Sequence, residues 1–360
     1  MARVKIEAHE IIAAYIKLYE GKTVSLIEFC GASGYSESRI FRTFGSWKKF
    51  LVACGVKEQE EVEPDPETSE KMLKKYKALC SKKEQIQGFF RHTIDLQDLF
   101  RRAGNPPSLK MIGLGDVHVK YMDPAAFHCM LQFAKWYNPH LFLIIGDFAD
   151  CEGISHWAPN TLQPKRLVPE LKKARKVLEA IEAHTPNVIG RIFCEGNHEN
   201  WIQQALLKMP ELFEGLSDLI DIEIDVKTLL GLEKYGYNFF PVNHFVKIGK
   251  LHFTHGIYTS SNHTKKHLDV LKTNLEYGHL HDKQEHNQTS MEGSMTSGCM
   301  GCLCRLDAMF LNGKPNNWVH LINIYEFFPD GNYTKMKPEI IDGKVSVFGK
   351  VFEGSKDWYP

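Results

Sequence analysis

Apolar residues recur at the spacing of an α-helix near the start of the chain, between residues 11 and 19. The tetrapeptide Ser25–Glu28 is a capping box, which predicts a second helix that runs into a glycine-containing turn at Gly31–Gly34. Two further helical segments are expected, at Glu37–Phe44 and at Trp47–Ala53. Helix, glycine-containing turn and helix are typical of a helix-turn-helix domain, in which Glu37–Phe44 would be the recognition helix.

This pattern ends in an acidic stretch, residues 58–67, which holds six acidic residues and two prolines. Such a segment cannot build a core, so we expect an extended linker. Residues 69–103 show a helical pattern with many lysines, which favours a solvated connecting helix over one that contacts a nucleic-acid backbone. The chain is therefore expected to have a small all-α domain at 1–57, a linker and connecting helix at 58–105, and a large domain at 106–360.

In the large domain, short apolar runs alternate with helical patterns. Strands are predicted at Leu109–Leu114, Leu141–Ile145 and Val188–Phe193. Helices are predicted between them, at Pro124–Trp136 and Pro169–His184. This alternation indicates an α/β fold.

Later segments of the chain add further strands. Phe245–Ile248 and Leu251–Thr254 flank a two-residue turn as a hairpin. Val319–Phe327 is followed by Thr334–Ile341 across a Pro-Asp-Gly-Asn turn. Because hairpins join antiparallel strands, we expect the sheet to become mixed.

Polar residues that can bind metal follow each of the first three predicted strands, at Gly115–His118, Gly146–Asp150 and Gly196–Glu199. Two further blocks of this kind follow at Thr254–Gly256 and Gly278–His281. α/β sheets place their sites at the carboxyl ends of strands, and Asp-x-His at such an end lets a carboxylate and an imidazole face the same ion. Any one block could be structural, but five in this order indicate a metal site.

The series D-x-H, G-D-x-x-D, G-N-H-E, H and G-H-x-H resembles the calcineurin-like metallophosphoesterase superfamily. The resemblance covers residues 108–282 and, with the following strands, extends to the C-terminus. It implies a mixed α/β sandwich of two β-sheets flanked by helices. It also implies a metal-dependent phosphoesterase that uses metal-bound hydroxide and two divalent ions, with Mn expected and Fe, Zn or Ni as alternatives.

The resemblance further implies a role for each residue of the blocks. One metal would be held by Asp116, His118 and His281. The other metal would be held by Asn197, His255 and His279. The carboxylate of Asp147 would bridge the two metals. His198 would stabilise the transition state or protonate the leaving oxygen, and Asp150 would orient His198.

The motifs leave the substrate open. The protein-phosphatase branch of the superfamily has Arg-Gly where this chain has Cys151–Glu152, which argues against a phosphoprotein substrate. The repair-nuclease branch has G-N-H-D, whereas the block here ends in Glu199. A phosphate clamp would have to come from elsewhere, and His156, Arg191 and Asn200 are candidates by their nearness in sequence.

The N-terminal segment resembles a short helix-turn-helix repeat that occurs beside homing endonucleases and in phage proteins. The resemblance rests on the string G-x-S-x-S-x-I-x-R-x-F-G-S-W, and its pairing with a phosphoesterase resembles phage or prophage proteins. The residues expected to contact DNA phosphates and base edges are Ser38, Arg39, Arg42, Lys48 and Lys49. DNA docking is favoured over a packing or oligomerisation module.

Charge and composition exclude few functions and partners. Lysines and arginines (44) equal aspartates and glutamates (44), so attraction for nucleic acid must come from a local patch. Residues 1–57 supply one, because they hold nine basic and five acidic residues. The nine cysteines are irregularly spaced and no apolar run approaches about 18 residues, so we expect a soluble cytoplasmic protein with no membrane contact, in the host cytoplasm if phage-encoded. The sequence leaves the oligomeric state open.

Other histidines and cysteines have a plainer interpretation. His156, His263, His267 and His286 have no partner block and are expected to be surface or satisfied core histidines. Cysteines 299, 302 and 304 form C-x2-C-x-C, which could be a zinc or redox site. Since the sequence offers no second cysteine cluster to complete a tetrahedral site, structural use is favoured.

The leading hypothesis is a two-metal phosphoesterase, brought to DNA by its N-terminal domain, that hydrolyses phosphodiester or terminal phosphate bonds of nucleic acid. One alternative is a phosphatase or phosphodiesterase acting on nucleotides or phosphoproteins. A second is a DNA-binding regulator whose phosphoesterase domain is silent.

Overall fold

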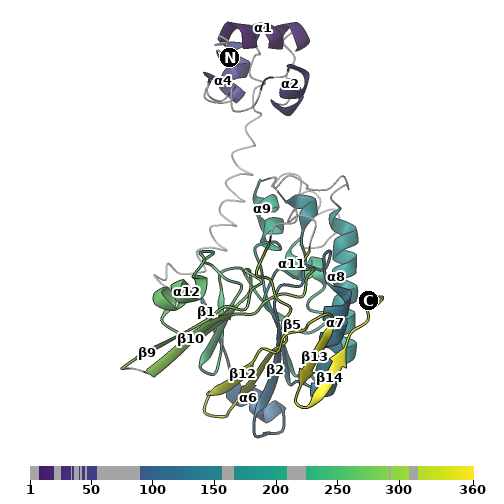
Figure 1. Ribbon diagram of the computed structural model, residues 1–360, viewed down its shortest axis with the longest axis vertical. Helices are drawn as coiled ribbons and strands as arrows, with labels where there is room; N and C mark the ends of the chain where they lie inside the picture. The colour runs from purple at the N-terminus through teal and green to yellow at the C-terminus, as the bar shows by residue number, and fades with distance from the viewer. Residues whose placement is uncertain are drawn as a thin grey trace, which may run out of the picture. The chain divides into compact units, whose positions relative to one another are not determined.

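The structure, a computed structural model, describes the chain in several segments. They are residues 8–19, 26–33, 35, 40, 43–44, 47–54, 90–155, 166–208, 224–291, 293–307 and 315–360. The chain divides into two compact units, Met1–Gln85 and Ile86–Pro360. Figure 1 shows the helices and strands of both.

The first unit contains helices α1 (Ala8–Tyr19), α2 (Leu26–Ser33) and α4 (Trp47–Ala53). Helices this short are marginal alone, so contacts between them must stabilise them. These contacts are aromatic. Tyr15, Phe29 and Phe50 are buried, and the centroids of their three rings lie 5.3 Å from one another.

The helices predicted at residues 11–19 and 47–53 are confirmed. The predicted turn at Gly31–Gly34 is wrong in part, since α2 continues through Ser33. Most of Glu37–Phe44 lies outside the described residues. The helix-turn-helix therefore stays a prediction.

The second unit is built on two six-stranded mixed sheets. The first has the order β12-β11-β2-β3-β4-β5, and in that order its strands are Tyr333–Met336, Asn323–Phe327, Leu109–Leu114, Leu141–Ile144, Gly190–Cys194 and Tyr237–Phe240. Strands β2 to β5 are parallel, and β11 and β12 are antiparallel additions. The three predicted α/β strands are therefore neighbours, and their carboxyl ends meet at one edge.

The second sheet has the order β1-β6-β7-β8-β10-β9. Its strands are, in that order, Arg91–Ile94, Phe245–Ile248, Leu251–Thr254, Leu275–Tyr277, Gly293–Cys299 and Glu285–Ser290. The predicted β6–β7 hairpin is confirmed as antiparallel, while β7 and β8 run parallel. Beyond the two sheets, β13 (Lys344–Val347) and β14 (Lys350–Glu353) form a separate hairpin.

Alternation along β3 shows how the layers are held together. Leu143 belongs to the apolar cluster between the two sheets, which also contains Val246 and Phe253 of the second sheet. Phe142 and Ile144 point the other way, into the cluster under the helices. β3 is therefore buried on both faces, as a central parallel strand should be.

Helices cover both outer faces of the sandwich (Figure 1). The first sheet is covered by α7 (Pro124–Tyr137) and α8 (Leu167–His184), with η1 (Glu152–Ile154), α9 (Asn200–Lys208) and α11 (Val226–Leu230) nearby. On the second sheet lies α12 (His263–Leu271). The expected two-sheet sandwich with flanking helices is thus confirmed. None of the helices in the described ranges has the length and apolarity needed to cross a bilayer.

The helix predicted over residues 69–103 is wrong in part where the structure describes it. Residues Arg91–Ile94 form β1, which pairs in parallel with β6, and a short helix, α6, follows at Leu96–Arg102. Leu99 and Phe100 of α6 are buried in the cluster between the sheets. Residues from about 90 onward therefore belong to the large domain rather than to a connector.

The substitution Leu143→Ala tests this layered core. Leu143 is fully buried, so removing its side chain is expected to lower the free energy of unfolding by about 2–5 kcal/mol. Val168→Ala, at a position 61% exposed on α8, is the control and should change it by less than about 0.5 kcal/mol. Urea unfolding of the two variants measures the difference, and equal effects would contradict the assignment.

Candidate active site

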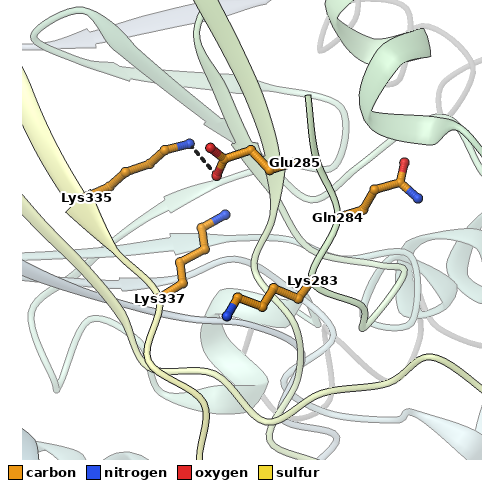
Figure 2. Close-up of a pocket in the computed structure, with 5 residues that line it drawn as sticks. All are labelled: Lys283, Gln284, Glu285, Lys335 and Lys337. Atoms are coloured by element: carbon orange, nitrogen blue, oxygen red, sulfur yellow. Dashed lines mark ion pairs between the residues drawn. The ribbon is translucent and has the colours of Figure 1, made fainter. Parts of the chain in front are cut away.

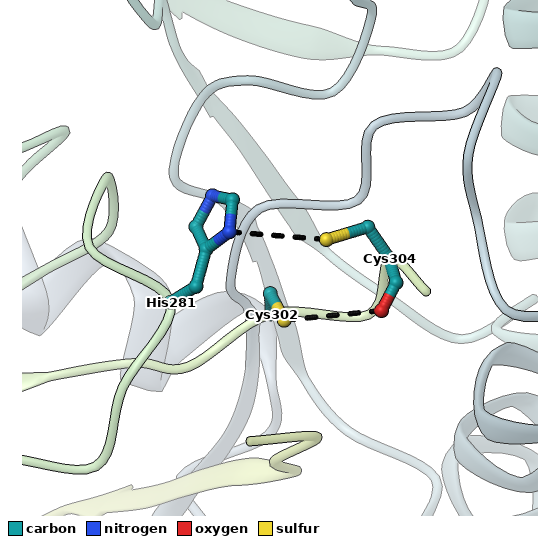
Figure 3. A group of neighbouring side chains, drawn as sticks. All are labelled: His281, Cys302 and Cys304. Carbon is teal, nitrogen blue, oxygen red and sulfur yellow. Dashed lines mark hydrogen bonds between the residues drawn. The ribbon is translucent and has the colours of Figure 1, made fainter. Parts of the chain in front are cut away.

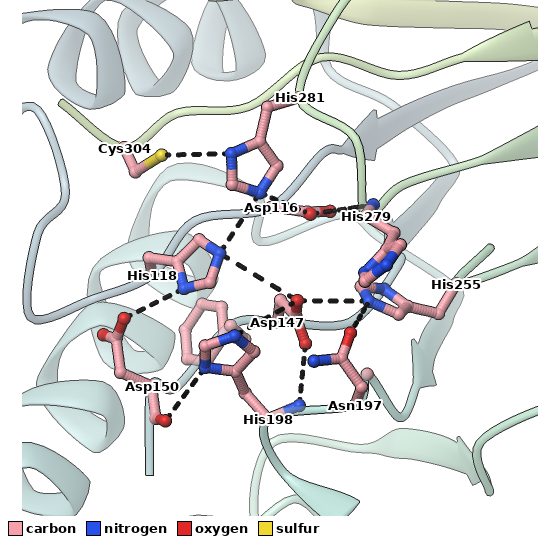
Figure 4. Close-up of polar contacts among 12 residues, drawn as sticks. Asp116, His118, Asp147, Asp150, Asn197, His198, His255, His279, His281 and Cys304 are labelled. Atoms are coloured by element: carbon pink, nitrogen blue, oxygen red, sulfur yellow. Dashed lines mark hydrogen bonds and ion pairs between the residues drawn. The ribbon is translucent and has the colours of Figure 1, made fainter. Parts of the chain in front are cut away.

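Five loops meet where the carboxyl ends of strands from both sheets converge. The loops after β2, β3 and β4 carry Gly115–His118, Gly146–Asp150 and Gly196–Glu199, and those after β7 and β8 carry Thr254–Gly256 and Gly278–His281. Figure 4 shows the side chains from these loops pointing toward one another. The structure thus brings together all five blocks that the sequence singled out.

Several residues of these loops have left-handed backbone conformations. The φ angles of His118, Asp147, His279 and His281 are 45°, 46°, 77° and 63°. Such angles are uncommon for residues other than glycine and cost about 1–3 kcal/mol each, so the surrounding contacts must impose them. These backbone conformations direct the four side chains into the cluster. No pattern in the sequence predicted these conformations.

One group of side chains is formed by Asp116, His118 and His281, all buried. The Nε2 atom of His281 lies 2.8 Å from Oδ2 of Asp116 and 3.2 Å from Nε2 of His118. The backbone N–H of His279 donates to both carboxylate oxygens of Asp116, over 3.0 and 2.8 Å. The Asp116 carboxylate is therefore fixed by the loop that follows β8.

A second group surrounds Asp147 and His255. Nε2 of His255 lies 3.1 Å from Oδ2 of Asp147 and 3.0 Å from Oδ1 of Asn197, and His279 is close to both Asp147 and His255. The same Oδ2 atom of Asp147 lies 3.9 Å from Nε2 of His118, in the first group. Asp147 is therefore the carboxylate between the two groups (Figure 4).

His198 lies at the rim of the cluster. Its Nε2 is 3.9 Å from Oδ2 of Asp147, its Nδ1 is 3.0 Å from the backbone carbonyl of Asp150, and its ring packs on that of Trp201. The carboxylate of Asp150 contacts Nδ1 of His118 instead, at 2.9 Å. Asp150 thus contacts His198 through its backbone, whereas its side chain orients His118, which the sequence did not predict.

Electrostatics in the cluster is dominated by burial and by carboxylate–imidazole pairs. Burial would lower the pKa of His255, but Asp147 raises this pKa to about 10. The same balance, with Asp116 as the carboxylate, raises the pKa of His281 to about 9. Burial would raise the pKa of Asp147, but His255 and His198 hold it well below its usual range. His255 and His281 therefore carry protons that a bound cation would displace.

The donor set fits divalent cations. Nδ1 of His279 is buried and has no hydrogen-bond partner among the described residues, which is costly for a polar atom unless a ligand engages it. Nε2 atoms of His118 and His281 face each other at 3.2 Å, an arrangement that a shared cation would satisfy. Carboxylate and amide oxygens with imidazoles suit Mn, Fe, Zn or Ni.

Glu199 has a role that the sequence did not reveal. Its carboxylate accepts hydrogen bonds from the backbone N–H groups of Asp147, Phe148, Ala149 and Gly196, over 2.6–3.0 Å. Burial and the charge of Asp147 raise the pKa of Glu199 to about 8. A Cβ at Gly196 would lie 2.2 Å from the nitrogen of Asp147, so only glycine allows these loops to approach. Glu199 thus fastens two loops together.

His267 holds the loop that follows His255. Its Nε2 accepts from the N–H groups of Ile257 and Tyr258, at 3.1 and 3.3 Å, so its Nδ1 must donate to the carbonyl of His263, at 2.8 Å. Burial lowers the pKa of His267 to about 4. The expectation of a satisfied core histidine is confirmed.

His263 holds the loop Gly278–His281 in a similar way. Its Nδ1 lies 2.6 Å from the hydroxyl of Tyr277, and its Nε2 lies 2.9 Å from Oδ2 of Asp282. These two partners stand immediately before and after Gly278–His281. His263 is also buried and bonded, as expected.

Two of the three candidate phosphate-clamp residues are described. Arg191 is buried, and its guanidinium donates to the hydroxyl and the carbonyl of Thr185, over 3.0 and 2.9 Å. This structural contact does not support a clamp at Arg191. Asn200 begins α9, whereas His156 lies outside the described residues.

A surface pocket holds several lysines but no residue of the five blocks. Its lining residues are Lys283, Gln284, Glu285, Lys335 and Lys337 (Figure 2). Nζ of Lys335 lies 2.8 Å from Glu276 and 2.9 Å from Glu285, and Nζ of Lys337 lies 2.5 Å from Glu276. Nζ of Lys283 lies 2.7 Å from Glu339. Carboxylates therefore neutralise these lysines.

The five predicted DNA-contacting residues are mostly outside the described part. Ser38, Arg39 and Arg42 lie outside it, and so does the side chain of Lys48 on α4. Lys49 is described and exposed. DNA contact therefore stays a prediction.

A family model for calcineurin-like phosphoesterases matches residues 109–295, more than half of the chain and all five blocks. The chain therefore belongs to the calcineurin-like phosphoesterase family. It is a metal-dependent phosphoesterase, and the family uses divalent metals.

Solved structures give more distant similarities. Vacuolar Protein Sorting 29 from Cryptosporidium parvum is 14% identical, with a TM-score of 0.38, over 69% of this chain and 100% of that chain. Vps29 from Chaetomium thermophilum is 12% identical, with a TM-score of 0.29, over 64% and 96%. Neither similarity bears on activity. No curated protein matches the chain.

Glu199→Gln tests the fastening of the two loops. An amide offers only one acceptor oxygen, so buried N–H groups lose partners and the free energy of unfolding is expected to fall by about 2–5 kcal/mol. Glu182→Gln is the same substitution on the exposed side of α8 and is the control. Thermal unfolding measures both, and an unchanged midpoint for Glu199→Gln would contradict the role.

His267 predicts a pH dependence of stability. Its pKa in the folded protein, about 4, is below the usual value of 6.5, so the unfolded chain binds the proton first as pH falls. Stability should therefore decrease between about pH 6.5 and 4, by roughly 3 kcal/mol from this residue. Urea unfolding of His267→Gln across this range should show a flatter dependence than wild type, and parallel curves would refute the assignment.

Proposed function

We propose that the protein is a two-metal phosphoesterase that hydrolyses phosphodiester or terminal phosphate bonds of nucleic acid. The observation that carries the two-metal part is the position of Asp147. One of its oxygens lies 3.1 Å from Nε2 of His255 and 3.9 Å from Nε2 of His118, so a single carboxylate reaches both groups of side chains. We place this activity in the cytoplasm.

The ligand sets follow from the two groups. One set comprises Asp116, His118 and His281; the other comprises Asn197, His255 and His279; and Asp147 joins them. Two divalent ions bound there would supply positive charge around the phosphoryl group and a water of lowered pKa. Manganese is our first choice among the ions that suit this combination of hard oxygens and imidazoles, with Fe, Zn and Ni as alternatives.

His198 is the proposed acid at the leaving oxygen. Its side chain is 25% exposed, whereas those of His118 and His255 are 4% and 2% exposed, so His198 alone of these three can reach a substrate. Its Nδ1 is directed at the carbonyl of Asp150, which fixes a proton on that atom. Nε2 then exchanges the proton that the leaving group takes up.

The nucleic-acid part of the proposal rests on the N-terminal segment. Residues 1–57 carry nine basic and five acidic residues and resemble a DNA-docking repeat of phage proteins, with Ser38, Arg39, Arg42, Lys48 and Lys49 as proposed contacts. The alternative substrates are nucleotides or phosphoproteins. The silent-domain alternative is disfavoured, because every residue of the proposed ligand sets is present and the described ones converge.

The variant His198→Ala separates turnover from metal binding. Since His198 is proposed to transfer a proton and not to hold metal, hydrolysis should fall about 100-fold or more while both ions stay bound. Elemental analysis and hydrolysis of an alkyl phosphodiester, whose leaving oxygen needs a proton, measure the two quantities. Asp147→Asn is the matched comparison, expected to lose both metal content and turnover. Loss of metal from His198→Ala would contradict its assignment.

The substrate is tested with end-labelled single- and double-stranded DNA in the presence of Mn²⁺. The full chain is compared with one that starts at residue 86, since β1 and α6 belong to the large domain. DNA cleavage that needs residues 1–85, with nitrophenyl-ester hydrolysis preserved without them, is the expected result. Ester hydrolysis with no action on DNA by either chain would contradict a nucleic-acid substrate.

A further inference from the structure

Two cysteines lie behind the cluster, on the far side of His281. The side chains of Cys302 and Cys304 are fully buried, and His281 is 5% exposed. Nδ1 of His281 lies 3.8 Å from Sγ of Cys304, and Nδ1 or Nε2 of His281 and the two sulfur atoms lie within 4.8 Å of one another. Figure 3 shows the three side chains gathered together. The sequence had favoured a purely structural use for these cysteines.

The backbone holds the two sulfurs on one side of an extended segment. Residues two apart in such a segment face the same way, so Cys302 and Cys304 share a face. Cys302 forms bridges to Asp116 and His320, and the N–H of Leu303 donates to the carbonyl of Asp116 over 2.8 Å. These backbone bridges hold the segment of the two cysteines in place, beside the segment that carries Asp116.

The separations approach those of a thiophilic cation site. Zinc bonds of about 2.3 Å to sulfur and 2.0–2.1 Å to nitrogen imply tetrahedral edges of roughly 3.5–3.8 Å. The 3.8 Å from Nδ1 of His281 to Sγ of Cys304 is close to the nitrogen–sulfur edge, which is about 3.5 Å. Two thiolates and one imidazole prefer soft or borderline ions, unlike the carboxylates and amide of the phosphoesterase cluster.

The hydrogen bonding of His281 leaves its Nδ1 available. Nε2 lies 2.8 Å from Oδ2 of Asp116, which is the geometry of a donated hydrogen bond. When the proton on Nδ1 of His281 leaves, the Nδ1 lone pair is directed at Cys304 and can bind a cation. Binding one divalent ion would displace this proton and the two thiol protons.

We propose that Cys302, Cys304 and His281 form a separate site for a thiophilic divalent ion such as Zn²⁺. Its fourth ligand is a water or another group. The site shares the His281 ring with the proposed phosphoesterase cluster, one nitrogen facing each. Binding at either site therefore changes the affinity of the other.

The test is a titration of the metal-free, reduced full-length protein with Co²⁺. Only cobalt bound by thiolate gives a strong charge-transfer band in the near ultraviolet. Cobalt bound in the phosphoesterase cluster, whose ligands are oxygens and imidazoles, therefore does not contribute to this band. We expect the band to saturate at one thiolate-bound ion per chain and to disappear when Zn²⁺ displaces cobalt. Absence of the band in folded wild-type protein would overturn the proposal.

Variants complete the experiment. The band should be lost in Cys302→Ser/Cys304→Ser and kept in Cys299→Ser, since Cys299 is equally buried but its sulfur faces the carbonyl of Gly278, at 3.9 Å. A band retained in the double variant would also overturn the proposal. Asp147→Asn should keep the band, because Asp147 is not a ligand of this site. The readout needs no turnover, so failure of the proposed phosphoesterase function would leave it unchanged.

Discussion

Buried carboxylates facing buried imidazoles are the constraint on which the site depends. Asp116 and Asp147 are 0% and 2% exposed, and a buried charge is strongly destabilising unless it is paired. His281 and His255 pair with them at 2.8 and 3.1 Å. The left-handed backbone at Asp147 and the close approach of Gly196 to it are consequences, because they hold the loops after β3 and β4 together and place the Asp147 carboxylate in the cluster.

The same arrangement divides the histidines by function. His118 and His255 are nearly inaccessible and directed at carboxylates, which suits residues that hold cations. His198 is more exposed and is held by a backbone carbonyl and by the ring of Trp201. Beneath them, His263 and His267 never face the cluster, yet they position the loops that do. Identical side chains thus serve three purposes, set by burial and partner.

Much of the large domain could be predicted from the sequence, because strand periodicity and metal-binding blocks are local patterns. The strands at β2, β3 and β4, the β6–β7 hairpin and the five convergent blocks needed no tertiary information. The roles of Glu199 and the Asp150 carboxylate did need it, since each contacts a partner far away in sequence. β1 was missed for the same reason, because its pairing with β6 overrides a local helical pattern.

The central claim is that Asp147 lies between two metal ions. Its most direct test is a crystal of the full-length protein soaked in Mn²⁺, with anomalous diffraction recorded at the manganese absorption edge. Two anomalous peaks about 3.5–4 Å apart, both in contact with the Asp147 carboxylate, are the predicted result. A single peak, or two peaks of which one lies away from Asp147, would contradict the account.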